Sequence, residues 1–188
     1  MSQEKELAFH IYEIHTDLAI KFGIDLANRT VQVVGEITDE TFCMIDTALT
    51  LLEAQSKASI TIKINSLGGS VYAALAIVGR MKAAKCHIIT EGYGACMSAA
   101  SLILAAGKKR RMSSLAWVMY HEMSYEIGGS HSQAKHMLEQ ADREEQAWVK
   151  TMVSLTGSSI WEDEGKFGKD FYLNPEQCKE LGVIDEIF

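Results

Sequence analysis

Short β-type segments alternate with helix-type segments along most of this chain. Ser59–Ile64 carries an apolar residue at every second position, and a helix-type pattern begins soon afterwards at Val71. Strict alternation is typical of a strand with one buried face, whereas apolar residues three and four positions apart are typical of an amphipathic helix. Because repeated β/α alternation builds a largely parallel sheet with helices packed against it, the sequence predicts the α/β class.

The composition indicates one folded domain over residues 1–188. A chain of 188 residues has the usual length of a single domain. Hydrophobic residues make up 47%, which excludes a disordered or fibrous protein. The net charge of −7 disfavours the phosphate backbone of nucleic acids as a partner. No repeat, low-complexity stretch or proline-rich linker divides the chain, so we expect a single domain that does not bind nucleic acid.

Targeting and cofactor motifs are absent from the sequence. The first residues lack the basic and apolar regions of a secretory signal, and the longest apolar stretch, 95–106, is too short to span a membrane. The four cysteines lie far apart and match no zinc-site spacing. The glycines near 92 and 107 fit neither a dinucleotide fingerprint nor a phosphate loop. We therefore expect a cytoplasmic protein with no membrane partner, no metal and no cofactor.

The helix-type segments differ in what surrounds them. Met97–Ala106 consists of small and apolar residues without a polar face, which predicts a helix buried on nearly all sides. The segment 132–156 predicts a helix of roughly 37 Å, which is longer than one small domain needs and is expected to project toward a partner subunit. Residues 1–23 are polar and weakly patterned, so they are expected to form a terminal arm. Further helices are expected at 39–55 after Thr38, after Ser70 and after Asn174.

Glycine-containing turns and a charged loop are expected between the strands. Thr30–Val34 is expected to stop at Gly35, and turns are expected at Asn65–Gly69 and at Gly92–Gly94. The basic cluster Lys108–Arg111 is expected to be a solvated loop, and the last strand is expected at Val183–Ile184.

Three polar residues are candidates for nucleophilic catalysis. Ser98 begins the buried helix, His121 ends the strand Trp117–Tyr120, and Asp170 precedes an aromatic pair. A serine is a weak nucleophile until a base takes its proton, and an acid must orient that base. Each residue alone more often has a structural role, as a cap, a packed histidine or a surface acid. Cys96 is a rival nucleophile, although its apolar surroundings favour a core position.

Several ordered motifs resemble the Clp protease proteolytic subunit family, ClpP. The likeness extends from about Ile24 to the C-terminus. Ile64–Ser70 resembles the family's I-N-S-P-G-G-x, and Gly94–Gly107 resembles G-x-A-A-S followed by L-L-A-A-G. Val118–His121 resembles V-M-I-H, and Asp170–Asp185 resembles D-x-F-L-S-A-x-E followed by E-x-G-L-V-D. The local sequence Ser98-Ala-Ala-Ser101 is similar to the form in phage and prophage members.

The resemblance implies a site and a reaction. It implies a serine endopeptidase with Ser98 as nucleophile, His121 as base and Asp170 as the acid of the triad. It implies that the amides of Gly69 and Ala99 form the oxyanion hole, with the substrate extended between the segments after Gly69 and after His121. No metal or cofactor is implied for this chain, because ATP is used by a partner ATPase.

The resemblance also implies a fold and an assembly. The fold would be the ClpP/crotonase-like spiral of β/α units, with 132–156 as a projecting handle helix and 1–23 as the arm or axial loop. The subunits would form heptameric rings stacked into a tetradecamer around an inner chamber. A Clp-type AAA+ unfoldase would deliver unfolded protein substrates for degradation.

The sequence departs from the family pattern at four places. Leu67 replaces a proline, Ala99 replaces a methionine, Glu122-Met123 replaces Gln-Pro, and the first twenty-odd residues do not match the axial-loop segment. The last difference favours an alternative, a phage or prophage protease that processes virion proteins without an ATPase. An inactive structural ring subunit, a crotonase-type acyl-CoA enzyme and a Ser–Lys peptidase are further alternatives, which the complete set of Ser98, His121 and Asp170 disfavours.

Overall fold

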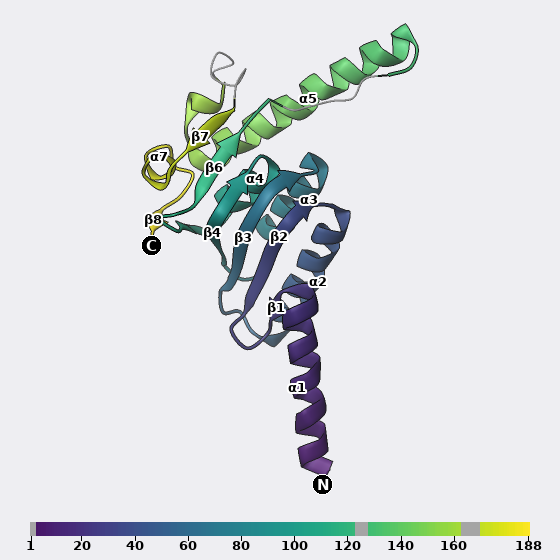
Figure 1. Ribbon diagram of the computed structural model, residues 1–188, viewed down its shortest axis with the longest axis vertical. Helices are drawn as coiled ribbons and strands as arrows, with labels where there is room; N and C mark the ends of the chain where they lie inside the picture. The colour runs from purple at the N-terminus through teal and green to yellow at the C-terminus, as the bar shows by residue number, and fades with distance from the viewer. Residues whose placement is uncertain (1–2, 123–127, 163–169) are drawn as a thin grey trace.

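The computed structural model describes residues 3–122, 128–162 and 170–188 (Figure 1). Its sheet runs in the order β1-β2-β3-β4-β5-β8, while β6 lies beside the end of β4 and β7 lies outside β6. The strands are β1 (Ile24–Asp25), β2 (Thr30–Ile37), β3 (Ile60–Gly69), β4 (Ile88–Met97), β5 (Lys109–Met112), β6 (Trp117–Tyr120), β7 (Phe171–Leu173) and β8 (Glu186–Ile187). All neighbouring pairs are parallel except β1 with β2 and β6 with β7.

Helices connect and cover these strands, which confirms the α/β class. The helices are α1 (Gln3–Phe22), α2 (Asp39–Gln55), α3 (Val71–Lys82), α4 (Ala99–Ala105), α5 (His131–Thr156) and α7 (Pro175–Glu180), with a short 3₁₀ helix η1 (Ser159–Glu162). Each residue of α4 is buried, as expected for a helix without a polar face. The alternating isoleucines of β3 are also buried, so the core lies between the sheet and these helices.

Local capping explains where several helices begin. The side chains of Thr38, Ser70 and Asn174 each accept a hydrogen bond from the third amide of the helix that follows. Such caps satisfy amides that have no partner inside the helix. The expected starts of α2, α3 and α7 are confirmed, and α2 has the expected bounds.

The expected glycine turns are wrong, because the strands continue through them. β2 passes through Gly35, β3 through Asn65–Gly69 and β4 through Gly92–Gly94. The β2–β3 pairing shifts register between Val34 and Glu36, and the β3–β4 pairing shifts at Ile64. Glycine can adopt the irregular backbone that such a shift requires, so these glycines accompany bulges rather than chain reversals.

The C-terminal strands also differ from expectation. The basic cluster is not a solvated loop, because Lys109–Met112 forms β5 and pairs with β4 and β8. Arg110 donates hydrogen bonds to Asp185, with a shortest N–O distance of 2.6 Å, and this ion pair joins β5 to the C-terminal segment. Val183–Ile184 is buried but is not a strand, since the last strand is β8.

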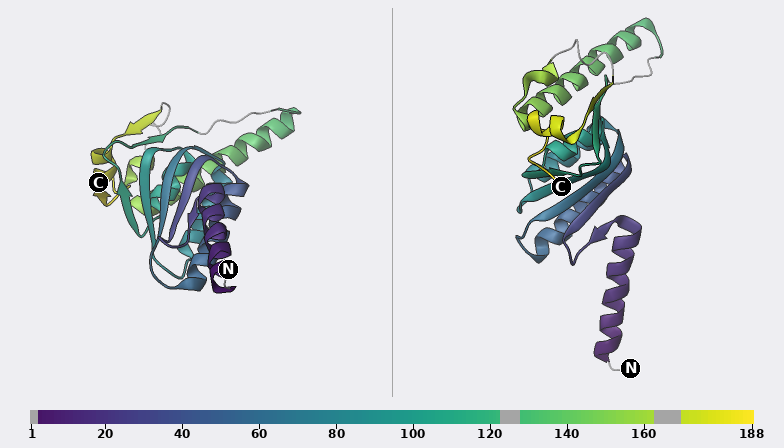
Figure 2. Two further views of the ribbon diagram at one scale, coloured as in Figure 1. Left: turned by 60° about the horizontal axis from the view of Figure 1, so that its bottom comes forward. Right: turned by 60° about the vertical axis from the view of Figure 1, so that its left-hand side comes forward.

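Two helices project from the body in different directions (Figures 1 and 2). α1 lies within the segment expected as an arm and extends away from the sheet below β1. Seven large apolar side chains of α1 are exposed: Leu7, Phe9, Ile11, Tyr12, Ile14, Ile20 and Phe22. α5 begins one residue before the expected helix, and its buried residues, Ala141, Trp148 and Met152, all lie beyond its first ten residues. Within the described ranges, no helix combines the length and apolar content needed to cross a membrane.

Candidate active site

Ser98 occupies a strained turn between β4 and α4. Its backbone has φ 51° and ψ −126°, which non-glycine residues rarely adopt. Its amide donates to the carbonyl of Met119 over 2.6 Å. The amide and hydroxyl of Ser101 both donate to the Ser98 carbonyl, at 2.9 and 2.6 Å. These bonds hold a conformation that costs energy, as is often seen at functional sites.

The pairing of β6 with β4 brings His121 to Ser98. Met97 of β4 pairs with Met119 of β6, and His121 follows the end of β6. The Nε2 atom of His121 lies 3.0 Å from the Oγ atom of Ser98. Both residues are partly buried. This distance allows the histidine to accept the hydroxyl proton directly.

Asp170 lies beside His121 in the sheet register. In the antiparallel pairing of β6 and β7, Tyr120 is opposite Phe171, so His121 and Asp170 stand one position further along. The Asp170 side chain is exposed, and among the described residues no hydrogen bond joins it to His121. The structure therefore brings Ser98 and His121 into contact, whereas, over the described ranges, Asp170, the third candidate, makes no hydrogen bond to His121.

Gly68 packs its main chain directly against Ser98. A Cβ atom added at Gly68 would lie 2.7 Å from the Ser98 Cβ and 2.9 Å from the Met97 carbonyl oxygen, and its φ is +108°. At Gly69, with φ +146°, an added Cβ would lie 2.7 Å from the amide nitrogen of Ile37. Only glycine fits at either position.

The amides near Ser98 differ in their partners. The Gly68 amide donates to the Ser66 hydroxyl over 3.0 Å. The Ser70 amide donates to the Ile37 carbonyl over 2.8 Å. Ala99 begins α4, where amides lack acceptors within the helix.

Sequence reasoning missed Ser66 and Asn65 as residues that shape the site. The Ser66 hydroxyl donates to the Gly35 carbonyl at 2.5 Å and accepts from the Gly68 amide, so it ties the β2 bulge to the glycine pair. The Asn65 Oδ1 atom accepts from the Ala95 amide at 3.0 Å. Ser66 continues the buried register of the β3 isoleucines, and a polar residue at such a position was the available signal.

Cys96 is unsuited to compete as a nucleophile. Burial raises the pKa of its thiol to about 12, and the thiol donates to the Ile64 carbonyl over 3.7 Å. Reactive cysteines need an accessible thiolate, which this environment denies. In the part of the chain that the structure describes, no group of three or more His, Cys, Asp or Glu side chains could hold a metal ion.

Comparisons with known proteins identify the family of this chain. Residues 19–188 match the family model described as Clp protease, a range that includes Ser98, His121 and Asp170 and leaves most of α1 outside. ATP-dependent Clp protease proteolytic subunit 1 of Prochlorococcus marinus subsp. pastoris is 33% identical over 168 residues, covering 85% of this chain and 83% of that protein. Subunit 1 of Corynebacterium jeikeium is 29% identical over 165 residues, covering 86% and 88%. Subunit 2 of Rhodococcus jostii is 28% identical over 165 residues, covering 86% and 85%. The chain therefore belongs to the Clp protease family and is a serine protease.

Proposed function

We propose that this protein is a serine endopeptidase in which Ser98 attacks the peptide carbonyl, His121 acts as general base and Asp170 orients His121. The observation that carries the proposal is the 3.0 Å contact between His121 Nε2 and Ser98 Oγ. The direct test is a fluorophosphonate probe, which reacts with activated serines. Mass spectrometry of the labelled protein is expected to find the adduct on Ser98, and an adduct only on other residues would contradict the assignment.

In the proposed reaction, His121 takes the Ser98 proton as Oγ bonds to the carbonyl carbon of the substrate. The resulting imidazolium gives that proton to the leaving amine, and the C–N bond breaks to leave an acyl-enzyme. Water, deprotonated by His121, then attacks the ester, and the departing Ser98 oxygen recovers its proton. The chemistry calls on no cofactor in this chain.

The amides of Gly69 and Ala99 are the proposed oxyanion donors. The place of Gly69 directly after Gly68, which packs against Ser98, and the position of Ala99 at the start of α4 support this assignment. Donors aimed at the developing negative charge stabilise the transition state more than the substrate. Gly68, whose amide is bonded to Ser66, serves instead to let the chain approach Ser98 closely.

Replacing Gly68 with alanine is expected to slow fluorophosphonate labelling of Ser98 by about 10²-fold, because the new methyl group would displace Ser98. The matched control is Gly79→Ala in α3, where an added Cβ meets no atom within 4 Å. The control is expected to label at the wild-type rate and to be more stable by about 0.5–1 kcal/mol, because alanine favours helix. The labelling rate and the thermal unfolding temperature should be measured for both variants. Wild-type labelling of Gly68→Ala would refute the packing role of Gly68.

The proposed role of Asp170 is supported by its register. Residues directly opposite in an antiparallel pair lie on the same face of the sheet, with Cβ atoms about 5 Å apart. The register of Tyr120 with Phe171, continued by one residue, supports a position of Asp170 opposite His121. In the proposed triad, the Asp170 carboxylate accepts a hydrogen bond from the second ring nitrogen of His121 during catalysis.

We further propose that the protein works as heptameric rings stacked into a tetradecamer, in the cytoplasm, with a Clp-type AAA+ unfoldase that uses ATP to deliver substrates. The relatives' names, ATP-dependent Clp protease proteolytic subunits, support this proposal. The exposed apolar side chains of α1 and the projecting first half of α5 also support it. Large exposed apolar surfaces are typical of interfaces between proteins.

An assembly is expected in solution, since an isolated subunit would leave these apolar surfaces in water. Light scattering coupled to gel filtration is expected to give about fourteen times the subunit mass of 20.8 kDa. A stable monomer that still hydrolyses unfolded protein would contradict the chamber proposal.

Two observations favour the alternative of a processing protease without an ATPase. The local sequence Ser98-Ala-Ala-Ser101 resembles the form in phage and prophage members. The family match begins at residue 19, so most of α1 is outside it. Degradation of an unfolded protein and of a folded, tagged protein should be compared with and without a Clp ATPase and ATP. Dependence on the ATPase for the folded substrate supports the unfoldase partner. Equal activity in both conditions, with no ATPase binding, supports the processing protease.

A further inference from the structure

Strand β6 carries contacts to both reacting residues. The Met119 carbonyl accepts the hydrogen bond from the Ser98 amide, and His121 directly follows the strand. The position of β6 therefore determines where the Ser98 backbone and the His121 ring lie relative to each other. Since β6 spans only Trp117–Tyr120, side-chain contacts are needed to hold it in place.

Tyr120 attaches β6 to α5. Its side chain is only 2% exposed. The ring stacks on Trp148 of α5, with centroids 4.0 Å apart and planes 23° from parallel, and it meets Trp161 edge to face. The hydroxyl donates to the Oε1 atom of Glu145 on α5 over 3.2 Å. Adjacent strand residues point to opposite faces, so Tyr120 faces α5 while His121 faces Ser98.

Tyr72 makes a second contact with α5, from the helix that follows Gly68 and Gly69. Tyr72 lies three residues after Gly69, at the start of α3, and its hydroxyl donates to the neighbouring glutamate of α5, Glu144. Gln140 donates to the same hydroxyl at 3.1 Å. The hydrogen bond to Glu144 raises the pKa of Tyr72. Because Tyr72 is 59% exposed, water competes for its hydrogen bond to Glu144, and we expect this bond to matter less than the partly buried bond between Tyr120 and Glu145.

We propose that Glu145 of α5 is a positioning residue for the peptidase reaction: through Tyr120 it holds β6, and with it His121, at the distance from Ser98 that proton transfer requires. Glu144 supports the Gly69 side of the site through Tyr72 in the same way. Neither glutamate contacts the reacting atoms, so both act through other residues. The inference rests on the proposed function of Ser98 and His121, and it assigns to α5 a role in arranging the site.

The effect should appear in kcat and leave KM nearly unchanged, because the Tyr120 side chain is buried against α5. Tyr120→Phe keeps the ring and its stacking on Trp148 and removes only the hydroxyl. It is expected to lower kcat, measured per titrated active site with a short peptide substrate, by about fivefold while KM stays within about twofold. Titration with the fluorophosphonate removes any contribution from misfolded protein.

Two variants of Glu145 separate the hydrogen bond from packing and charge. Glu145→Gln keeps an acceptor oxygen and is expected to retain more than about half of the wild-type kcat. Glu145→Leu removes the acceptor and is expected to lose about as much as Tyr120→Phe. The double variant Tyr120→Phe/Glu145→Leu is expected to be no slower than either single variant, since all three lack the same bond.

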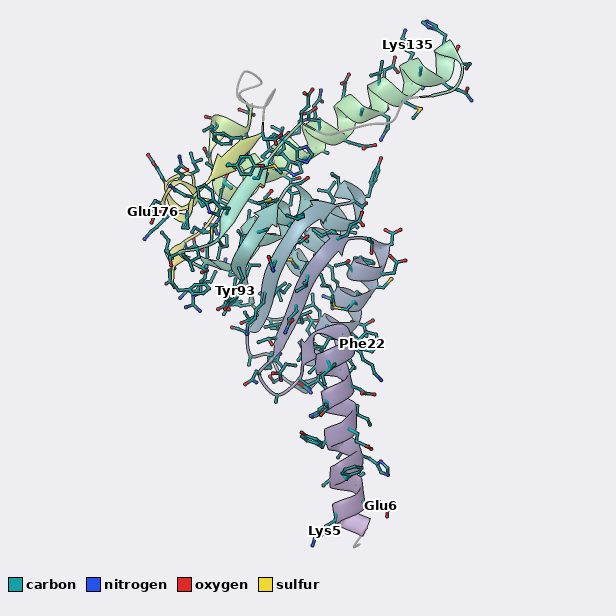
Figure 3. All side chains as sticks on the ribbon, viewed as in Figure 1. Lys5, Glu6, Phe22, Tyr93, Lys135 and Glu176 are labelled. Carbon is teal, nitrogen blue, oxygen red and sulfur yellow. The ribbon has the colours of Figure 1, made fainter. Side chains whose placement is uncertain are left out.

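Tyr93→Phe is the matched control. Tyr93 donates to Glu91 over 3.1 Å, a tyrosine–glutamate bond of nearly the same length, at a part of β4 remote from the projecting end of α5 where Lys135 lies (Figure 3). Wild-type kcat is expected for this variant. If wild-type protein fails to label at Ser98, the proposed function falls. If wild-type protein labels at Ser98, three results would each overturn only the inference about Glu145. These results are a wild-type kcat for Tyr120→Phe, a Glu145→Gln variant as slow as Glu145→Leu, and a Tyr93→Phe variant as slow as Tyr120→Phe.

Discussion

Replacing Ser98 with alanine is expected to abolish fluorophosphonate labelling and to lower kcat for peptide hydrolysis by at least about 10⁴-fold. The substitution removes the hydroxyl that lies 3.0 Å from His121 and leaves the protein without a nucleophile to form the acyl-enzyme. Alanine faces the same backbone strain at φ 51° as serine, and the Ser98 side chain makes no capping bond to α4, so the fold is expected to survive. Labelling and hydrolysis should be measured on the same preparation.

Cys96→Ala is the control for a competing nucleophile. The Cys96 thiol is buried, with its pKa raised to about 12, so its removal is expected to leave the labelling rate unchanged. The Ser98→Ala variant should also resist alkylation at Cys96 near neutral pH, because almost no thiolate is present. Labelling that persists in Ser98→Ala, on Cys96 or on another residue, would show that the nucleophile lies elsewhere.

Asp170→Asn is expected to lower kcat by about 10⁴-fold, because an amide cannot stabilise the imidazolium of His121 and favours the wrong tautomer. Asp170 is exposed and has no hydrogen bond to His121 in the described part of the chain, so thermal stability is expected to change little. The measurement is kcat and KM with a short peptide, together with the unfolding temperature. A large kcat loss at unchanged stability would establish that Asp170 engages His121 during catalysis.

Glu180→Gln is the matched control for loss of a nearby surface carboxylate. Glu180 is exposed at the end of α7 and contacts neither Ser98 nor His121. Wild-type kcat is expected, since a lone exposed charge contributes little to stability. Should Asp170→Asn also keep wild-type kcat, His121 would have to be oriented by a different group, and the triad proposal would lose its third member.

Helix boundaries were predictable because their causes are local. Thr38, Ser70 and Asn174 cap helices within three residues of themselves, so nothing distant in the fold is needed to find these starts. The burial of Ala99–Ala105 was predictable for a similar reason, since a helix with one serine among small and apolar residues has no polar face that favours water.

Strand boundaries at glycines were predicted wrongly because the deciding contacts are distant. Gly35 and Gly69 occur in sequences typical of turns, but both lie in strands whose partners come from other parts of the chain. The pairing of β2 with β3 keeps Gly69 within the strand at φ +146°, a backbone conformation that favours glycine. Glycine signals conformational freedom, and only the neighbouring strand determines how that freedom is used.

The sequence alone determined the chemical types at the site and their order along the chain: a serine before a buried helix, a histidine at the end of a strand, an acid before an aromatic pair, and two adjacent glycines. The tertiary structure decided which of them meet. Pairing of β6 with β4 sets Ser98 and His121 3.0 Å apart, and packing of Gly68 against Ser98 excludes any side chain there. It also decided that Tyr120 reaches Glu145 on α5. Such contacts join residues many positions apart, and their distances follow from sheet register and packing, which local sequence does not encode.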